Sequence, residues 1–283
     1  MLNFWLKRIN NPKKELNRLL KGYELPSFPD AVMKVLALLR NQDSSMQEIS
    51  KYLQMDPGIH VCILKTVNSA AFGLAARVSN IHHAVTLLGR SRLESLVLAF
   101  AVKSVLPSVD IPCLNMRKFW VTAARRATLA GIVARLAHPA TQVESFAAGL
   151  LQDMAIPVIS SLNRNGYCSV IDEWDTDGRV RPDILERNIF GYDHQIIGGL
   201  MAEQWELPAY LVASISEHHC LDRKTQVEPA VKLVSCFRYG NNTDDMGTFM
   251  DTCTEELGLD PDMLKELTES AFEEAEGLSR VFV

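Results

Sequence analysis

This sequence of 283 residues contains no long apolar run and no recognisable export signal. Its longest uninterrupted apolar run covers residues 96–102, whereas a transmembrane helix needs about 18 to 20 apolar residues. Lys7, Arg8, Lys13 and Lys14 interrupt the apolar residues near the N-terminus, so the compact core of a signal peptide is missing. The sequence therefore predicts a soluble cytoplasmic protein with no membrane partner.

Closely spaced cysteine pairs are also absent, although the chain has 6 cysteines. None of them shows the CxxC spacing that is typical of metal-binding or redox-active motifs. Most lie among apolar neighbours, which favours reduced and mostly buried thiols. These residues are Cys62, Cys113, Cys168, Cys220, Cys236 and Cys253.

The catalytic motifs of several common enzyme classes are missing too. There is no GxSxG nucleophile elbow, no GxGxxG dinucleotide fingerprint, no P-loop and no HExxH metalloprotease helix. Their absence excludes α/β-hydrolases, Rossmann-fold dehydrogenases, P-loop nucleotide hydrolases and zincin metalloproteases. Any catalytic site must use another arrangement of residues.

What is present is a normal globular composition, with 47% hydrophobic and 22% charged residues and a formal net charge of -5. The charge comes from the ends of the chain. Residues 1–22 hold six basic residues and one glutamate, whereas residues 241–283 hold twelve acidic and two basic residues. The neutral middle lacks the concentrated basic face that nucleic-acid binding needs, so we expect no nucleic-acid partner. The acidic segment is either a solvated helix face or a partner surface.

Apolar residues recur with helical spacing through most of the chain, which predicts an all-α fold. Ser45, Asp56 and Asn80 are typical N-caps, and Gly89 is a typical helix stop. Ser91, with a glutamate three positions on, resembles a capping box that starts a further helix. Residues 23–108 are therefore predicted to form a lobe of five short helices.

A second lobe is predicted at residues 113–240, after a proline-flanked connection. Residues 163–184 within it are rich in Asn, Asp and Gly, which predicts turns. A basic helical leader at residues 1–22 and an acidic helical segment at residues 241–283 flank the two lobes. Helical patterns cover residues 115–136, 142–158 with a break near Pro157, 184–190, 193–204, 208–219, 228–240 and 261–277.

A small set of polar residues stands where apolar residues would be expected. Asp153 lies within an apolar segment, and a buried carboxylate must be paired, hydrogen-bonded or bound to metal. His194 follows 41 residues later and the pair His218 and His219 a further 24 residues on. One carboxylate and three imidazoles suit a divalent transition metal, but the same residues could equally form a hydrogen-bonded network.

These residues belong to a larger pattern of segments that spans both lobes. In the first lobe the segments are residues 25–29, Asp56-Pro57, the turn at residues 67–73 and residues 81–89. In the second lobe they are Phe119-Trp120, residues 147–153, residues 190–194, Gly198, Trp205, Leu207-Pro208 and His218-His219. Together these segments resemble the HDOD domain, the HD-related output domain of bacterial signalling proteins.

The resemblance implies an all-α, two-lobed fold whose second lobe is a degenerate HD domain. Active HD phosphohydrolases hold metal with a first His, a His-Asp doublet, further histidines and a final Asp. Here Thr122 stands for the first His, Gln152 precedes Asp153, and Ser235 or Cys236 falls where the final Asp belongs. Hydroxyl and amide groups are weak ligands for transition metals, so a bridged two-metal centre is not expected.

Two interpretations of the remaining quartet stay open. No cofactor is expected if Asp153, His194, His218 and His219 form a closed hydrogen-bonded network. The alternative is a residual site for a single divalent metal, Fe, Mn, Ni or Zn, or for a small ligand.

The resemblance further implies a non-catalytic output or adaptor module that acts through contacts with signalling proteins, such as a sensor or a cyclic-nucleotide turnover enzyme. The main alternative is a metal-dependent phosphohydrolase or phosphodiesterase of the HD superfamily. A second alternative is a nucleic-acid-binding regulator, suggested by the helix, Gly89 turn and helix. Asn68, Ser69 and Gly73 form a turn motif that is either architectural or part of a partner-binding groove.

Overall fold

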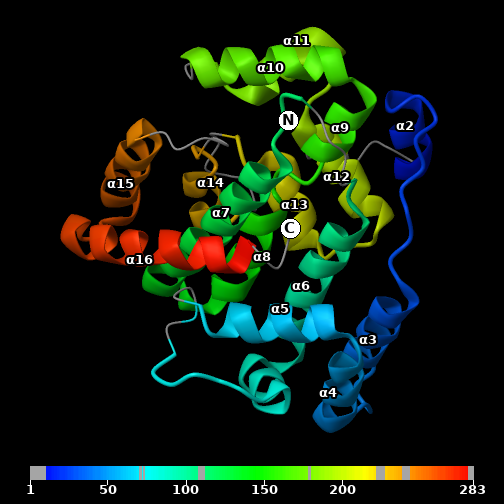
Figure 1. Cartoon of the computed structure of the whole chain (residues 1–283), viewed down its shortest axis with the longest axis vertical. Helices are drawn as coiled ribbons and strands as arrows, with labels where there is room; N and C mark the ends of the chain where they lie inside the picture. The colour runs from blue at the N-terminus through cyan, green and yellow to red at the C-terminus, as the bar shows by residue number, and fades with distance from the viewer. Residues whose placement is uncertain are drawn as a thin grey trace.

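The computed structural model describes residues 11–69, 72, 74–107, 112–177, 180–220, 227–237 and 243–279, and all its regular elements are helices (Figure 1). The all-α prediction is therefore confirmed. The first half contains α2 (Pro12–Leu19), α3 (Asp30–Arg40), α4 (Met46–Met55), α5 (Pro57–Val67) and α6 (Ile81–Val105). The second half contains α7 (Met116–Ala137), η1 (Pro139–Thr141), α8 (Gln142–Leu151), α9 (Ile156–Leu162), α10 (Arg164–Asp177), α11 (Pro182–Phe190), α12 (His194–Gln204), α13 (Ala209–Glu217), α14 (Pro229–Val234), α15 (Thr243–Leu257) and α16 (Pro261–Ser279).

Side-chain caps set the predicted helix starts in the first half. The Ser45 hydroxyl accepts from the N–H of Glu48 at 3.1 Å, and the Asp56 carboxylate accepts from the N–H of Ile59 at 3.0 Å. These caps satisfy N–H groups that have no partner within the helix. The predicted starts of α4 and α5 are confirmed.

Gly89 interrupts α6 without ending it. Its backbone has φ 71° and ψ 174°, a region essentially restricted to glycine. Arg90 follows at once and donates to carbonyls at the end of α3, to Leu38 at 3.1 Å and Asn41 at 2.9 Å. The predicted stop at Gly89 is thus a kink between two helical segments.

One apolar core runs through both predicted lobes. It includes buried side chains of α3, α5 and α6 together with those of α8, α12 and α13. Trp205 donates from Nε1 to the Pro26 carbonyl at 3.1 Å, and Tyr210 donates to the Ser95 hydroxyl at 2.6 Å. Residues 23–108 and 113–240 are therefore joined by packing and by hydrogen bonds.

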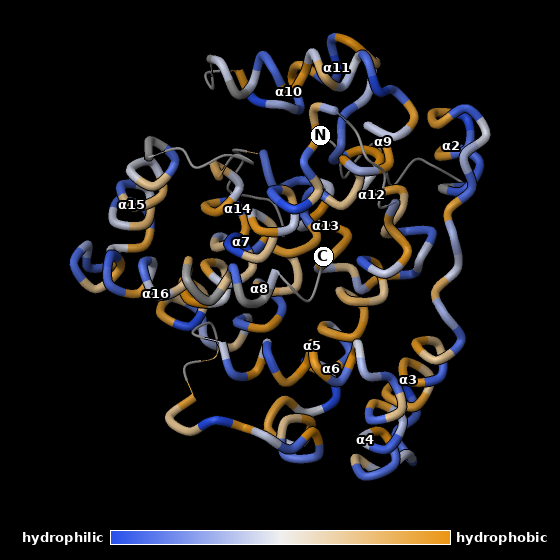
Figure 2. Tube along the Cα trace, in the orientation of Figure 1, coloured by the Kyte–Doolittle hydropathy of each residue, from blue (hydrophilic) through white to orange (hydrophobic). Residues whose placement is uncertain are grey.

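A second apolar cluster involves the acidic C-terminal segment. The later half of α7 packs with α14, α15 and α16, and its buried residues include Leu129, Val133, Phe249 and Leu264. Figure 2 shows hydrophilic and hydrophobic residues mixed along α15 and α16, at the edge of the molecule. These helices cover the core with an apolar face, although their sequence is strongly acidic.

The prediction of turns at residues 163–184 is wrong, because most of this segment forms α10. Tyr167, Val170, Ile171 and Trp174 recur at helical spacing and are buried. Asn163 precedes the helix, and Asn165 lies in its first turn with an exposed side chain. Burial of one apolar face outweighed the weak helix propensity of Asn, Asp and Gly.

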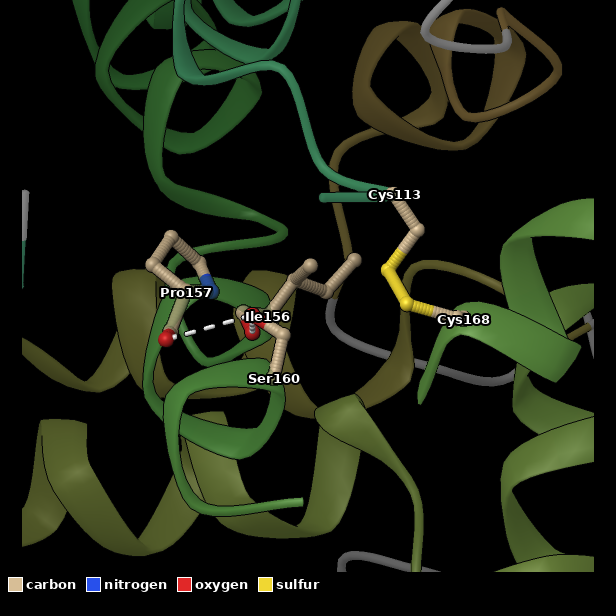
Figure 3. Close-up of a disulfide and its surroundings, with 5 residues drawn as sticks. All are labelled: Cys113, Ile156, Pro157, Ser160 and Cys168. Atoms are coloured by element: carbon tan, nitrogen blue, oxygen red, sulfur yellow. Dashed lines mark hydrogen bonds between the residues drawn. A yellow bond between two sulfur atoms is a disulfide. The ribbon is translucent and has the colours of Figure 1, made fainter. Parts of the chain in front are cut away.

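The prediction that all cysteines are reduced is also wrong. Cys113 and Cys168 form a disulfide with their Cα atoms 5.1 Å apart, and the side chain of Ile156 points toward it (Figure 3). These two residues are 55 positions apart in the chain, so only the fold brings them together. Of the remaining cysteines, Cys62 and Cys253 are buried, and Cys220 and Cys236 are half-buried.

One segment is long and apolar enough to span a membrane, which the sequence prediction overlooked. It covers Pro139–Leu162, with a mean hydropathy of 1.3 over its most apolar window, of which 89% is buried inside the fold. In the structure this stretch is divided among η1, α8 and α9. Its apolar character is accounted for by its place in the core.

Candidate metal or ligand centre

Four side chains named from the sequence meet at one buried point. Asp153 lies in the turn between α8 and α9, His194 is the first residue of α12, and His218 and His219 follow α13. One ligand atom from each residue lies within 4.8 Å of all the others. The fold thus gathers a carboxylate and three imidazoles from the ends of three helices.

Hydrogen bonds fix the orientation of the His194 ring. The Asp193 carboxylate caps α12 by accepting from the N–H of Ile196 at 2.7 Å. Glu186 Oε2 accepts from the N–H of His194 at 2.7 Å and lies 2.6 Å from His194 Nδ1. The Tyr167 hydroxyl donates to Glu186 Oε1 at 2.6 Å. These contacts leave Nε2 of His194 facing Asp153.

His218 and His219 are held by backbone contacts. Nδ1 of His218 lies 2.9 Å from the Ile215 carbonyl, which also turns its Nε2 toward Asp153. The N–H of His219 donates to Gln195 Oε1 at 3.0 Å, and its carbonyl accepts from Arg181 at 2.7 Å. Each ring is therefore positioned by groups outside the quartet, as in many metal centres.

The distances among Asp153, His194 and His218 are close to those between the ligands of a tetrahedral metal, and His219 offers a ligand atom within 4.8 Å of each of them. Nε2 of His194 is 3.1 Å from Nε2 of His218, and Asp153 Oδ1 is 3.3 Å from His218 Nε2 and 3.6 Å from His194 Nε2. Zinc–nitrogen bonds of about 2.0 to 2.1 Å separate tetrahedral ligands by about 3.3 to 3.4 Å. The donor set of nitrogen and carboxylate oxygen also suits Fe, Mn or Ni.

The ionisation of these groups follows from burial and from their charged neighbours. Burial alone would lower the pKa of His194, but the carboxylates of Glu186, Asp153 and Asp193 together outweigh it and raise the pKa to about 9. Burial lowers the pKa of His218, and with two neighbouring imidazoles it holds that of His219 well below its usual range. In the metal-free protein, protonated His194 can donate from Nε2 to Nε2 of His218, which lies 3.1 Å away.

A buried arginine supplies the second feature of the centre. Arg126 on α7 forms an ion pair with Asp153 Oδ2 through one terminal nitrogen. Its other terminal nitrogen donates a hydrogen bond to the Phe237 carbonyl. Burial would raise the pKa of Asp153, but Arg126 and the imidazoles hold it well below the usual range. One oxygen of Asp153 thus faces the histidines and the other faces a guanidinium.

The four positions at which the resemblance implies missing metal ligands carry neither an imidazole nor a carboxylate. Thr122 is buried on α7 one turn before Arg126. Gln152 is buried, and its amide has no hydrogen-bond partner among the described residues. The Ser235 hydroxyl donates to the Lys232 carbonyl at 2.6 Å, and the Cys236 thiol donates to the Leu233 carbonyl at 3.2 Å. Ser235 and Cys236 thus contact the backbone of α14.

The turn motif lies in the first lobe and has a separate role in the structure. Asn68 donates to the carbonyls of Leu64 at 2.8 Å and Val78 at 2.7 Å, and it accepts from the N–H of Val78 at 2.7 Å. The Ser69 hydroxyl donates to the Thr66 carbonyl at 2.7 Å. Asn68 thereby closes the base of a loop, whereas Gly73 lies outside the described residues.

Sequence reasoning missed Arg126, Glu186 and Tyr167. Arg126 follows another arginine within an apolar helix, so the sequence does not tell which of the two points inward. Glu186 lies on α11 in a charged segment for which the sequence predicts solvent exposure, yet its side chain is fully buried. The one available signal is helical spacing, because Arg126 lies four residues after Thr122 and shares its face.

The described helices thus bring one aspartate and three histidines together at their ends. The model of the HDOD domain matches residues 25–221, and the chain belongs to this family. A proposed phosphohydrolase from Shewanella amazonensis SB2B shares the fold with a TM-score of 0.69 and 21% identity, covering 95% of this chain and 98% of that one.

Two further proteins resemble the chain. A proposed signal transduction protein from Marinobacter aquaeolei VT8 has a TM-score of 0.65 and 18% identity, covering 96% of this chain and 65% of that one. An uncharacterized protein from Treponema pallidum (strain Nichols) is 25% identical over 221 residues, which make up 78% of this chain and 42% of that protein. The chain therefore spans less than half the length of this relative.

Proposed function

We propose that the protein is a non-catalytic signalling output module that passes a state to other proteins through direct contact. Its partners would be signalling proteins, such as a sensor or a cyclic-nucleotide turnover enzyme. Family membership and the similarity to a proposed signal transduction protein support this role. The chemistry of the buried centre supports its non-catalytic character.

The observation that carries the proposal is the Arg126–Asp153 ion pair. Here the guanidinium occupies Oδ2, and its positive charge repels a second cation. Thr122 and Gln152 supply no imidazole that could compensate. The hydrolytic chemistry of a two-metal clamp is therefore not available.

A second candidate function is favoured by the ligand distances. Asp153, His194, His218 and His219 would hold one divalent metal, and the chain would then be a metal-dependent phosphohydrolase or phosphodiesterase. A bound metal would polarise a phosphate and lower the pKa of a bound water. In this role Glu186 would orient His194, and Arg126 would keep Asp153 ionised.

Nucleic-acid binding has no comparable support. The would-be recognition helix carries residues 96–102, all of which are buried. Arg90, which would contact phosphates, instead donates to carbonyls at the end of α3. Duplex binding that weakens steeply with salt and is lost in Arg90→Ala and Arg92→Ala would contradict this exclusion.

The experiment that separates the two candidates measures metal content and turnover together. The protein is purified without chelators, its Fe, Mn, Ni and Zn contents are determined, and it is assayed on cyclic dinucleotides and a generic phosphodiester. We expect no turnover, with or without added metal. Turnover that is abolished in Asp153→Ala but kept in Ser235→Ala would overturn the non-catalytic proposal, because the Ser235 hydroxyl donates to Lys232 of α14 and not to the quartet.

The partner role has its own test. Affinity capture from the native cell, followed by binding of the recovered signalling protein to the purified chain, should give a saturable complex. Capture that recovers no sensor and no cyclic-nucleotide enzyme would contradict the proposed class of partner.

A further inference from the structure

The Cys113–Cys168 disulfide joins two segments that are far apart in sequence. Cys113 lies in the connection between α6 and α7, and Cys168 lies in α10. In the described part of the chain, α10 packs mainly against α9 and α11, at the edge of the molecule (Figure 1). The disulfide is thus the covalent tie between this peripheral helix and the connection that leads into α7 (Figure 3).

The residue beside Cys168 reaches the buried centre. The fully buried Tyr167 donates to Glu186 Oε1 at 2.6 Å, and its ring stacks on Phe190 of α11 with centroids 6.2 Å apart. Glu186 Oε2 accepts from the N–H of His194 at 2.7 Å. Two hydrogen bonds therefore separate the neighbour of Cys168 from His194.

The Glu186 contact is important for the start of α12. His194 is the first residue of that helix, and its N–H has no partner within the helix. Glu186 supplies that partner from a fully buried position. If Tyr167 moves, Glu186 loses a neutral donor that holds its buried charge in place, and the hold on His194 weakens.

We propose that Cys113 and Cys168 are a reversible redox modification site that controls how firmly Tyr167 and Glu186 hold His194. Both cysteines are half-buried, so a small thiol or disulfide can reach them. In the oxidised protein α10 is tied down and the chain of contacts is closed. In the reduced protein α10 is released from the connection, and the contacts from Tyr167 to His194 open more often.

The reaction is thiol–disulfide exchange with a small-molecule disulfide of the glutathione type. One protein thiolate attacks a sulfur of the small oxidant. The disulfide bond of the oxidant breaks, the first small thiol leaves, and a mixed disulfide forms between the protein and the second small thiol. The second protein thiolate then attacks the protein sulfur and displaces the second small thiol. The two protein thiols are oxidised, one small disulfide is reduced, and the two protons end on the released thiols.

The inference goes beyond the proposed function, because it requires neither a bound metal nor a partner. The first measurement counts free thiols by alkylation and mass spectrometry over a series of reduced-to-oxidised glutathione ratios. We expect Cys113 and Cys168 to close and reopen together within this range. A pair that stays closed at every ratio, or never closes, would overturn the proposal.

The second measurement follows hydrogen exchange at the His194 amide in the full chain. We expect exchange to be about tenfold faster or more in the reduced protein and in Cys168→Ser, as for the loss of one hydrogen bond to a buried charge. Cys113→Ser should behave in the same way and serves as the second variant if Cys168→Ser does not fold. Equal exchange in the oxidised and reduced proteins would overturn the proposal.

Two tyrosine variants separate the relay from general loosening. Tyr167→Phe keeps the ring and the disulfide but removes the donor to Glu186, so the His194 amide should exchange fast in both redox states. Tyr192→Phe is the matched control, because its hydroxyl pairs with Asn163 at 3.3 Å. It should retain the difference between the two states. A redox effect that persists unchanged in Tyr167→Phe would contradict the relay.

Discussion

At the scale of single residues, the Arg126–Asp153 pair governs the energetics of the centre. Both side chains are almost fully buried, so each charge depends on the other for compensation. Removing one partner leaves an uncompensated charge in a region of low dielectric. The loss of a buried partner costs more than the net contribution of the intact pair.

We expect Asp153→Ala to destabilise the fold by about 3 to 5 kcal/mol, as for other broken buried pairs. Arg126→Met should have a similar effect, because it leaves the Asp153 carboxylate without its cation. The double variant should lose much less than the sum of the two. Urea unfolding of all four proteins measures this cycle, and strictly additive losses would contradict a coupled pair.

His194 and His219 predict how the stability of the metal-free protein varies with pH. The pKa of His194 is raised to about 9, so its contribution is complete below pH 6.5 and is lost as pH rises through about 9. The pKa of His219 is held low, so below about pH 6.5 the unfolded chain binds a proton at this residue and the folded chain does not. The stability of the fold therefore decreases as the pH falls below about 6.5. Stability should therefore be highest near pH 6.5.

Urea unfolding in the presence of a chelator, from about pH 5 to pH 10, checks this profile. In Glu186→Gln the carboxylate that raises the pKa of His194 most is gone, so the decline above pH 7 should become shallow. An alkaline decline of unchanged steepness in that variant would show that another group causes it.

The quartet could be predicted from the sequence, because an aspartate and three histidines in apolar surroundings must be paired, hydrogen-bonded or bound to metal. The groups that decide its chemistry were not. Arg126 and Glu186 are ordinary helical charges in the sequence, and only the packing of α7 and α11 buries them. Charge in a sequence does not reveal burial, which depends on contacts between distant segments.

At the scale of elements, prediction succeeded where a local interaction sets the structure. Ser45 and Asp56 cap α4 and α5 as their spacing predicts. It failed where distant contacts decide, as in α10, whose turn-forming residues are outweighed by a buried apolar face. Glu94 is a second example. It was predicted to form a capping box with Ser91, but its carboxylate forms an ion pair with Arg40 of α3 at 2.7 Å.

Gly89 provides a prediction at this scale. Its backbone lies at φ 71° and ψ 174°, and a Cβ atom there would meet nothing within 4 Å. Gly89→Ala should therefore destabilise the protein by about 1 to 3 kcal/mol through the backbone alone. Gly247→Ala is the matched control, because that glycine is helical and equally open, and it should stabilise by about 0.5 to 1 kcal/mol. Thermal unfolding of both variants checks the opposite signs.

At the scale of the whole molecule, the two apolar clusters do not follow the division of the chain into a basic leader, a neutral middle and an acidic C-terminal segment. The larger cluster joins the two lobes, and the smaller one joins the later half of α7 to α14, α15 and α16. The acidic C-terminal segment thus has two roles, because its apolar face completes a core and its charged face remains outside. Its charge alone suggested only a solvated helix face or a partner surface.

Deletion of residues 243–283 tests which role dominates. Without α15 and α16, buried residues such as Leu129 and Val133 of α7 would lose their cover. We expect the shortened chain to melt at a lower temperature and to bind a hydrophobic dye, because each exposed large apolar side chain costs about 1.5 to 3 kcal/mol. A control that replaces exposed Glu266 and Glu269 with Gln should leave the melting temperature nearly unchanged. A shortened chain as stable as the full one would reduce the segment to a solvated tail, and the second cluster would then not contribute to folding.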